Sequence, residues 1–216
     1  MSISQLIGVM GGTFDPIHYG HLRMAQEISD SLDLSTVHFI PSATPPHKSN
    51  IAVSAVHRAE MVRLAIADNP KFKLDTRELE RQGASYSIDT LESLRQELGN
   101  EASICMLLGS DAFLKLNTWH RWNELLNICH IILVQRPHTD IQEALPAELQ
   151  TLLDNHYSEH IEDLNLAPSG HINMQHITAL DISATAIRED IKHGRSLRYL
   201  MPESVISYIE AHQLYA

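Results

Sequence analysis

Cysteine is scarce in this chain of 216 residues, and it builds no disulfide or metal-binding pattern. The two cysteines, Cys105 and Cys129, stand in separate apolar stretches and form no Cys-x-x-Cys pair. Such usage is typical of reduced thiols in the cores of cytosolic proteins rather than of a disulfide scaffold. We therefore expect two buried free thiols and a cytoplasmic protein.

Positive charge and long apolar runs are lacking as well. Lysine and arginine total 16 against 27 aspartates and glutamates, which gives a formal net charge of −11. This balance argues against a broad nucleic-acid or membrane-binding face, although a basic pocket can still exist inside an acidic protein. No apolar run approaches the roughly 18 residues that a membrane span needs, and the first run is too short for a signal peptide. We expect one domain over residues 1–216, with no nucleic acid and no membrane as partner.

Several common phosphate-binding and catalytic motifs are missing. There is no Gly-x-x-x-x-Gly-Lys-Ser/Thr loop, which excludes the P-loop nucleotide hydrolases. No Gly-x-Gly-x-x-Gly follows the first predicted strand, which weakens the case for a dinucleotide cofactor. His-Glu-x-x-His and Gly-x-Ser-x-Gly are absent too. A nucleotide site in this chain must therefore be built in another way.

Apolar runs alternate with helical patterns along most of the chain. They predict strands at residues 6–10, 37–40, 72–74, 104–108 and 131–134, and helices at residues 22–32, 54–67, 89–98, 141–153, 182–191 and 203–212. Asp89 and Glu92 have capping-box spacing at the start of the third of these helices. The alternation favours a doubly wound, Rossmann-like α/β fold with a parallel sheet, helices on both faces and a small helical C-terminal portion. Ligands of such sheets bind beyond the carboxyl ends of the strands, so the loops there form the candidate site.

The segment Gly11–His21, GGTFDPIHYGH, follows the first predicted strand. Gly11 and Gly12 permit a close approach of the backbone to a ligand. His18 and His21 fall at the start of the next helix and share a face at i, i+3 if both are helical. Because a helix N-terminus carries free N–H groups and partial positive charge, the segment predicts an anion site with two imidazoles directed into it. The alternatives are a tight turn with two surface histidines and, less well supported, a zinc site without further ligands at suitable spacing.

A second segment, Ile182–Arg188, reads ISATAIR and alone would be a helix N-terminus with a serine cap. Together the two segments resemble the His-x-Gly-His and Ile-Ser-x-Thr-x-Ile-Arg signatures of the nucleotidylyltransferase superfamily, in the right order. That superfamily joins a nucleotide or phosphate ester to the α-phosphate of a nucleoside triphosphate. The resemblance implies catalytic roles for His18, His21 and Arg188. It implies an ATP site made of these three residues together with Gly11, Gly12, Thr13, Phe14, Gly109, Asp111, Ile182, Ser183 and Thr185.

Within the superfamily the chain resembles the bacterial nicotinate-nucleotide adenylyltransferases over nearly its whole length. The further matching segments are Pro45–Lys48, Tyr86–Leu91, Gly109–Asp111, Thr118–Trp119, Arg136–Pro137, Tyr208–Ile209 and Leu214–Tyr215. The resemblance implies a nicotinate-nucleotide site made of Ser42, His47, Lys48, Tyr86, Ser87, Trp119, His120 and Arg136. Ser42 departs from the family, which often has asparagine there, and a hydroxyl reaches less far than an amide.

Three of the singled-out side chains also have purely structural interpretations. Asp111 could cap the helix that follows it, whereas the resemblance places it near the ATP ribose. Trp119 and Trp122 could both be core anchors, and for Trp122 we prefer that interpretation. For Trp119 the resemblance implies instead that the substrate ring stacks on it.

The activity implied by the resemblance is transfer of the adenylyl group of ATP to nicotinate mononucleotide, giving nicotinate adenine dinucleotide and pyrophosphate in NAD biosynthesis. Mg²⁺ would accompany ATP without a legible protein ligand. The two nucleotides are the expected partners, and a homo-oligomer remains open. One alternative is another adenylyltransferase of the superfamily, acting on nicotinamide mononucleotide or phosphopantetheine; Tyr86, Ser87 and Trp119 argue against phosphopantetheine. The other is a non-catalytic nucleotide-binding regulator, which would be expected to lack a signature histidine or Arg188.

Overall fold

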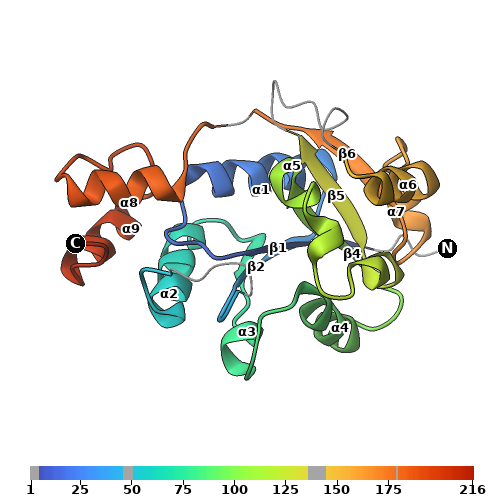
Figure 1. Cartoon of the computed structure of the whole chain (residues 1–216), viewed down its shortest axis with the longest axis horizontal. Coiled ribbons are helices and arrows are strands. Elements are labelled where there is room, and N and C mark those ends of the chain that lie inside the picture. The colour runs from blue at the N-terminus through green and yellow to red at the C-terminus, as the bar shows by residue number, and fades with distance from the viewer. Residues whose placement is uncertain (1–4, 46–50, 136–144, 179) are drawn as a thin grey trace.

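Six parallel strands form one sheet in this computed structural model, which describes residues 5–45, 51–135, 145–178 and 180–216 (Figure 1). The strands are β1 (Leu6–Gly12), β2 (Thr36–Pro41), β3 (Phe72–Leu74), β4 (Ser103–Gly109), β5 (His130–Gln135) and β6 (Ile172–His176). Their order across the sheet is β3-β2-β1-β4-β5-β6, and every neighbouring pair is parallel. The chain therefore winds outward in both directions from the β1–β4 pair, as the predicted doubly wound fold requires.

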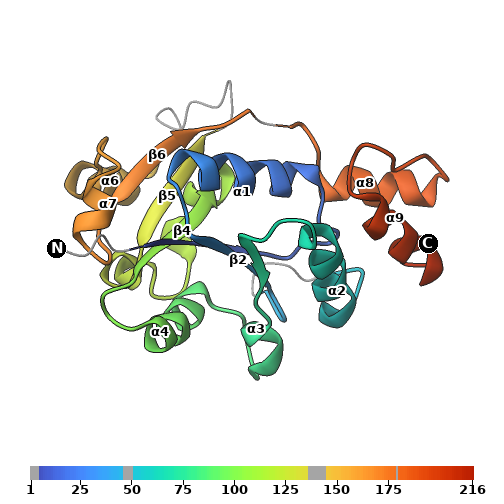
Figure 2. The ribbon, with the colours of Figure 1, turned by 180° about the vertical axis from the view of Figure 1, so that it is seen from behind.

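Helices cover both faces of the sheet. They are α1 (Tyr19–Ser31), α2 (Ala55–Ile66), α3 (Arg77–Glu80), α4 (Ser87–Leu98), α5 (Ser110–Phe113), α6 (Ala147–His156), α7 (Asp163–Leu166), α8 (Ala184–Lys192) and α9 (Glu203–Ala211), with 3-10 turns η1 (Leu116–Thr118) and η2 (Trp122–Asn127). Figures 1 and 2 show α1 on one face and α3 and α4 on the other. The C-terminal helices α8 and α9 lie at the α2 end of the molecule, away from α6 and α7.

The strands are apolar on both sides because each side faces a separate core. In β4, Cys105 and Leu107 point into one core, whereas Ile104, Met106 and Leu108 point into the other. The first core is shared with α1, α2 and α9, and the second with α4 and η2. This alternation of neighbouring side chains confirms the predicted fold class.

Both cysteines are buried and free, as predicted. Burial raises the pKa of each thiol, that of Cys129 to about 12, so neither carries a thiolate at neutral pH. Among the described helices, none combines the length and apolar character that crossing a bilayer demands.

Two sequence predictions differ from the structure. Strand β6 was not predicted, because INMQH mixes polar residues into an edge strand that pairs only with β5 in the sheet. The capping box at Asp89 is wrong, since α4 begins at Ser87 and places Asp89 inside its first turn. Instead, Glu92 accepts from Arg121 at 2.7 Å, and Asp89 lies 4.0 Å from the same guanidinium.

The bounds of other predicted helices also differ: the helix predicted at residues 22–32 is α1, Tyr19–Ser31. The helix predicted at residues 141–153 begins at Ala147, with residues 141–144 outside the described part, and it continues to His156. The helix predicted from Ile182 begins at Ala184, because Ser183 is its N-cap. A serine N-cap has extended backbone and therefore precedes the first helical residue.

Candidate functional site

The carboxyl ends of β1 and β4 meet at the centre of the sheet, where the strand order reverses. Such a switch point opens a crevice beyond the strands, which is where doubly wound sheets bind ligands. Strand β1 ends in Gly11 and Gly12, β4 ends in Gly109, and β2 ends at Pro41, which pairs with Gly12. The loops that follow β2, β1 and β4 therefore lie together at one edge of the sheet, and each contains predicted site residues.

His18 and His21 come together at the start of α1. His18 is the N-cap, with extended backbone (φ −151°, ψ 171°), and His21 is the third helical residue. Their ring centroids lie 3.8 Å apart at an interplanar angle of 33°. The Nδ1 atom of His21 accepts from the backbone N–H of His18 at 3.3 Å, so a neutral His21 ring carries its proton on Nε2. This capping contact therefore orients the His21 ring at the start of α1.

At two glycines, an added side chain would crowd a neighbouring ring. A Cβ on Gly20 would lie 2.9 Å from Nδ1 of His18, closer than real contacts allow, so the His18 ring occupies the space a side chain would need. A Cβ on Gly12 would lie 2.9 Å from the Phe14 ring. By contrast, a Cβ on Gly11 would meet nothing within 4 Å, which leaves room there for a ligand.

Phe14 is part of the core rather than an open ligand contact. Its side chain is 2% exposed and meets His21 edge-on at a centroid distance of 5.1 Å. Its backbone is left-handed at φ 48°. A contact between Phe14 and ATP would therefore have to use the backbone, while the ring supports His21 from behind.

The two signature segments meet in space although they are far apart in the chain. Arg188, on α8, donates from Nη1 to the backbone carbonyl of Asp15 at 2.7 Å and from Nη2 to Oγ1 of Thr185 at 3.2 Å. Ser183 caps α8 by accepting from Ala186 N at 3.2 Å. The carbonyl of Ile182 lies 3.5 Å from where a Cβ on Gly20 would stand. Helices α1 and α8 thus begin beside each other, and both N-termini favour negative charge.

Arg58 is a residue at this edge that sequence reasoning missed. It is 1% exposed, and its guanidinium donates to the backbone carbonyls of Thr13, Ser42 (2.6 Å) and Val53 (3.1 Å). Burial lowers the pKa of Arg58, and the nearby Asp15 charge opposes that shift. One guanidinium therefore fixes the loops that follow β1 and β2. An arginine inside a helical pattern reads as a surface residue, so the sequence carried no signal for this role.

The residues predicted to bind the second nucleotide gather around the start of α4. Tyr86 is the N-cap of α4, Ser87 is its first residue, and the Tyr86 ring contacts the His120 ring at a centroid distance of 4.4 Å and a tilt of 33°. Trp119 lies half-buried against the α4-side core, two residues before the left-handed Arg121 (φ 51°). Trp122 packs half-buried on the same core, as preferred from the sequence.

The loop after β2 is tied to that region through Ser85. Its hydroxyl accepts from the backbone N–H groups of Ala43 and Thr44, both at 3.1 Å, and Ser42 begins this loop. The predicted site residues His47, Lys48 and Arg136 lie outside the described residues.

Asp111 sits in the first turn of α5 and is exposed, next to the carboxyl end of β4. The N-cap of α5 is Gly109, so the capping interpretation of Asp111 is wrong. Ser110 is buried instead and donates to the carbonyl of Val134 at 3.1 Å. The exposed carboxylate at the crevice is left to a ligand or solvent.

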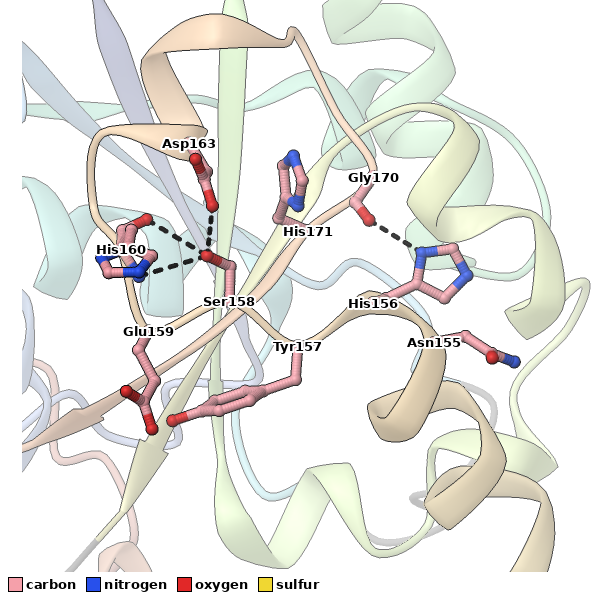
Figure 3. A pocket seen from close by; sticks show the side chains of 9 residues that line it. All are labelled: Asn155, His156, Tyr157, Ser158, Glu159, His160, Asp163, Gly170 and His171. Atoms are coloured by element: carbon pink, nitrogen blue, oxygen red, sulfur yellow. Dashed lines mark hydrogen bonds between the residues drawn. The ribbon is translucent and has the colours of Figure 1, made fainter.

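A hollow of about 540 Å³ lies at the opposite, amino edge of the sheet, near the starts of β5 and β6 (Figure 3). It is lined by Asn155, His156, Tyr157, Ser158, Glu159, His160, Asp163, Gly170 and His171. Several of its polar groups pair with one another, such as His156 with the Gly170 carbonyl at 2.8 Å. Within the described ranges, no three histidine, cysteine or acidic side chains cluster closely enough to hold a metal ion.

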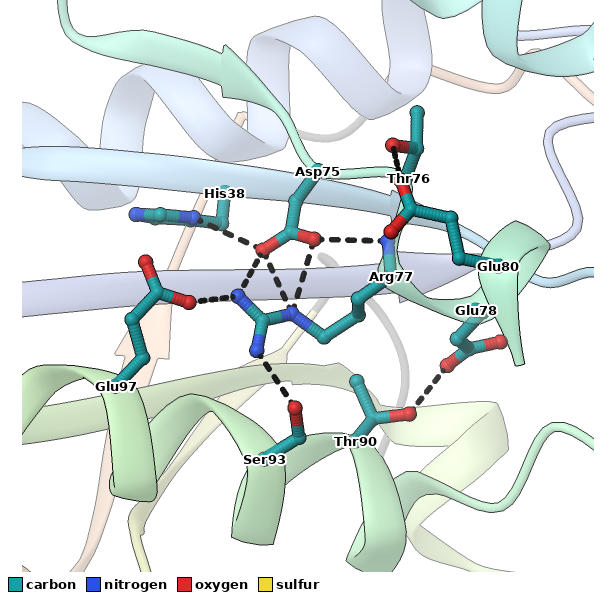
Figure 4. A network of polar contacts seen from close by, with 9 residues as sticks. All are labelled: His38, Asp75, Thr76, Arg77, Glu78, Glu80, Thr90, Ser93 and Glu97. Carbon is teal, nitrogen blue, oxygen red and sulfur yellow. Dashed lines mark hydrogen bonds and ion pairs between the residues drawn. The ribbon is translucent and has the colours of Figure 1, made fainter.

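A second polar network, around Asp75, joins the end of β3 to α4 (Figure 4). Arg77 donates to Asp75, to Ser93 and to Glu97, while His38 contacts Asp75 at 3.3 Å. Burial would raise the pKa of Asp75, but the hydrogen bonds from His38 and Arg77 outweigh burial and hold that pKa well below its usual range. The mutual pairing of these groups makes this a structural network.

Comparisons with known proteins show the family to which the chain belongs. Residues 9–190 match the family model described as cytidylyltransferase-like. A probable nicotinate-nucleotide adenylyltransferase of Pseudomonas putida (strain W619) is 46% identical over 97% of this chain and 94% of its own length. One of Halorhodospira halophila is 47% identical over 92% of this chain and 90% of its own. The chain therefore belongs to the cytidylyltransferase-like family and, within it, to the nicotinate-nucleotide adenylyltransferases.

A solved structure supports the fold independently of close sequence similarity. The nicotinic acid mononucleotide adenylyltransferase of Plasmodium falciparum, complexed with NaAD, matches with a TM-score of 0.72 at 20% identity, covering 98% of this chain and 97% of that one. Both the predicted family and the predicted fold class are confirmed.

Proposed function

We propose that this protein transfers the adenylyl group of ATP to nicotinate mononucleotide, giving nicotinate adenine dinucleotide and pyrophosphate. The observation that carries the proposal is the meeting of the two signature segments at the switch point. Arg188 reaches the Asp15 carbonyl at 2.7 Å, beside the two histidines at the start of α1. The family to which the chain belongs supports the same reaction.

The reaction needs placement more than it needs a base. The nucleophile is a phosphate monoester whose second pKa is about 6, so it is mostly dianionic at neutral pH. One of its oxygens attacks the α-phosphorus of ATP, and the bond from that phosphorus to the bridging oxygen of the β-phosphate breaks, releasing pyrophosphate. The protein must align the two phosphates and relieve their repulsion.

The residues at the carboxyl edge suit these tasks. His18 and His21 donate to phosphate oxygens as charge shifts during the transfer. Arg188 offers a planar fork of donors to the β- and γ-phosphates that leave. Arg58 holds carbonyl oxygens of the surrounding loops away from the anions, since Thr13 and Ser42 direct theirs to its guanidinium.

Mg²⁺ enters as part of the ATP substrate. The carboxylate of Asp15 has donors on both oxygens, Tyr215 at 2.8 Å and the Ala52 N–H at 3.2 Å. Those contacts fit an ion held mainly by phosphates and water rather than by a protein cage. Asp111 is the candidate acceptor for the ATP ribose.

We assign the preference for nicotinate mononucleotide over nicotinamide mononucleotide to backbone N–H donors. Helix α4 begins at Ser87, so its first N–H groups lack intrahelical acceptors and sit at a positive dipole end. With the ring on Trp119 and the carboxylate near Ser87 and His120, these donors suit an acceptor-only group. The carboxamide of the nicotinamide nucleotide would set an N–H donor against a donor.

The remaining predictions are part of the same proposal. The chain acts as a single nucleotidylyltransferase domain, in the cytoplasm, with ATP and nicotinate mononucleotide as partners, and a homo-oligomer stays open. His47 or Lys48 is proposed to add positive charge over the phosphates, and Arg136 is proposed to bind the nicotinate nucleotide.

The test is pyrophosphate release from ATP with a panel of acceptors: nicotinate mononucleotide, nicotinamide mononucleotide and phosphopantetheine. We expect kcat/KM for the nicotinate nucleotide to exceed that for the nicotinamide nucleotide by at least about 100-fold. Trp119→Ala should weaken both while changing their ratio little, because stacking does not distinguish acid from amide. Comparable kcat/KM values for the two nucleotides would contradict the substrate assignment. Lack of release with every acceptor would favour a non-catalytic nucleotide-binding regulator.

A further inference from the structure

The segment that follows α9 returns to the loop that carries the first signature. Tyr215 is 8% exposed, and its hydroxyl donates to Oδ1 of Asp15 at 2.8 Å, across 200 positions of the chain. The backbones of Gln213 (φ 50°) and Tyr215 (φ 67°) are left-handed, which non-glycine residues seldom adopt. Strained backbone of this kind persists where surrounding contacts hold it in place, and here the contact is with Asp15.

The side-chain carboxylate and the backbone carbonyl of Asp15 have different partners. Its carboxylate is held by Tyr215 on Oδ1 and by the Ala52 N–H on Oδ2, at 2.8 and 3.2 Å. Its backbone carbonyl accepts from Nη1 of Arg188 at 2.7 Å, while Oδ2 stays 3.9 Å from the same nitrogen. The negative charge is therefore near Arg188 but is not hydrogen-bonded to it.

We propose that Tyr215 is a positioning residue for Arg188: by holding the Asp15 carboxylate, it keeps the Arg188 guanidinium available to an anionic ligand. A buried carboxylate that loses a donor must find another, because leaving it unsatisfied is costly. The charged donor 3.9 Å away is Arg188, and arginine–carboxylate pairs are strong. Without the Tyr215 hydroxyl, Asp15 draws Arg188 onto itself and competes with phosphate.

Burial supports the role of Tyr215 as a donor. The ring lies in the protein interior, and this burial, reinforced by the Asp15 charge, raises the pKa of the hydroxyl well above its usual range. The hydroxyl therefore keeps its proton at neutral pH. The proposal rests on the proposed function, because it takes Arg188 to contact the ATP phosphates.

The test compares Tyr215→Phe with Tyr208→Phe. The hydroxyl of Tyr208, on α9, is hydrogen-bonded to Nδ1 of His57 at 2.8 Å. Tyr208→Phe therefore controls for the loss of a tyrosine hydrogen bond near the C-terminus. Calorimetric titration with Mg²⁺ and α,β-methylene ATP should give a Kd raised about 3- to 10-fold in Tyr215→Phe and unchanged in Tyr208→Phe. The KM for nicotinate mononucleotide should stay constant. In an Asp15→Asn background, Tyr215→Phe should add less than about twofold, because both act through one contact.

Arg188→Ala, titrated in the same way, separates the two possible failures. If Arg188→Ala weakens nucleotide binding and Tyr215→Phe does not, Tyr215 has no positioning role and the proposed function stands. If Arg188→Ala has no effect, the phosphate role of Arg188 fails and this inference fails with it. Equal losses for both substrates in Tyr215→Phe, or additive losses in the double variant, would make Tyr215 merely structural and overturn the proposal.

Discussion

Histidine pairs mark both edges of the sheet, and the two pairs differ in what holds them. At the carboxyl edge, His18 and His21 lie at a helix N-terminus, with ring centroids 3.8 Å apart. At the amino edge, His130 and His171 stack at 5.5 Å and 11° beside the hollow of Figure 3. Both nitrogens of His130 contact backbone: Nε2 meets the Ala167 carbonyl at 2.9 Å, and Nδ1 accepts from the His171 N–H at 3.1 Å.

The difference separates a histidine pair that we propose to bind a ligand from one that stabilises the fold. Burial lowers the pKa of His130 to about 4, so it stays neutral and holds two chain segments together. At the carboxyl edge, two helix N-termini and Arg188 converge where a negative charge would be stabilised. Local backbone geometry, rather than the histidine content of 14 residues, therefore identifies the chemistry.

The largest expected effect comes from removing either histidine of the first pair. His18→Ala and His21→Ala should each lower kcat by about 100- to 1,000-fold while weakening ATP binding much less, because their donors act where charge develops. His171→Ala, from the second pair, should change kcat less than about twofold. Steady-state pyrophosphate release measures all three. A near-normal kcat in either of the first two would remove that histidine from the mechanism.

A smaller loss is expected from Arg188→Lys. Lysine keeps the charge but loses the planar fork, so the KM for ATP and the inhibition constant of pyrophosphate should rise about 10-fold. Arg195→Lys is the matched control, because Arg195 is exposed and pairs only with Asp190 among the described ion pairs. If the two variants behave alike, the triphosphate role of Arg188 is wrong.

Gly20→Ala should reduce kcat about 5- to 10-fold with little change in stability. Alanine favours a helix more than glycine by about 1 kcal/mol, which offsets the local crowding. The new Cβ would displace the His18 ring, which stands 2.9 Å from its position. Thermal unfolding and kcat, measured on one preparation, test this. Unchanged kcat would show that the position of the His18 ring is not critical.

The smallest effect on turnover is expected at His130, where the readout is acid stability. Its pKa is about 4 in the folded chain against a usual 6.5, so below pH 6.5 the unfolded chain binds a proton that the folded chain does not. Stability present above pH 6.5 is therefore lost as the pH falls toward 4, at up to about 1.4 kcal/mol per unit. His130→Asn should flatten this slope in urea unfolding between pH 6.5 and 4.5. The control His160→Asn, at an exposed position, should retain it. A retained slope in His130→Asn would show that another group titrates there.

The sequence predicted well where local pattern decides structure. The β1–β5 runs, the amphipathic helices and the switch-point loops follow from periodicity and glycine placement. Strand β6 was not predicted, because an edge strand needs a less apolar sequence than a central strand does. The start of α4 was misplaced because Asp89 and Glu92 carry a capping pattern, although both face Arg121.

Contacts between distant parts of the chain could not be predicted. Nothing near Arg58 in the sequence says that it binds carbonyls of two loops, and nothing near Tyr215 says that it reaches Asp15. The role of Gly20 depends on the position that the His18 ring takes in the folded protein. The contacts of these residues with the first signature segment can therefore be seen only in the tertiary structure.

Hydrogen–deuterium exchange of the unmutated protein tests most directly that the carboxyl edge, and not the amino-edge hollow, binds the substrates. Exchange is compared with and without Mg²⁺, α,β-methylene ATP and nicotinate mononucleotide. The account predicts slower exchange in peptides covering residues 11–23 and 182–190, with no change over 155–163 and 170–172. Protection confined to the second set would place the ligands at the hollow of Figure 3 and contradict the account.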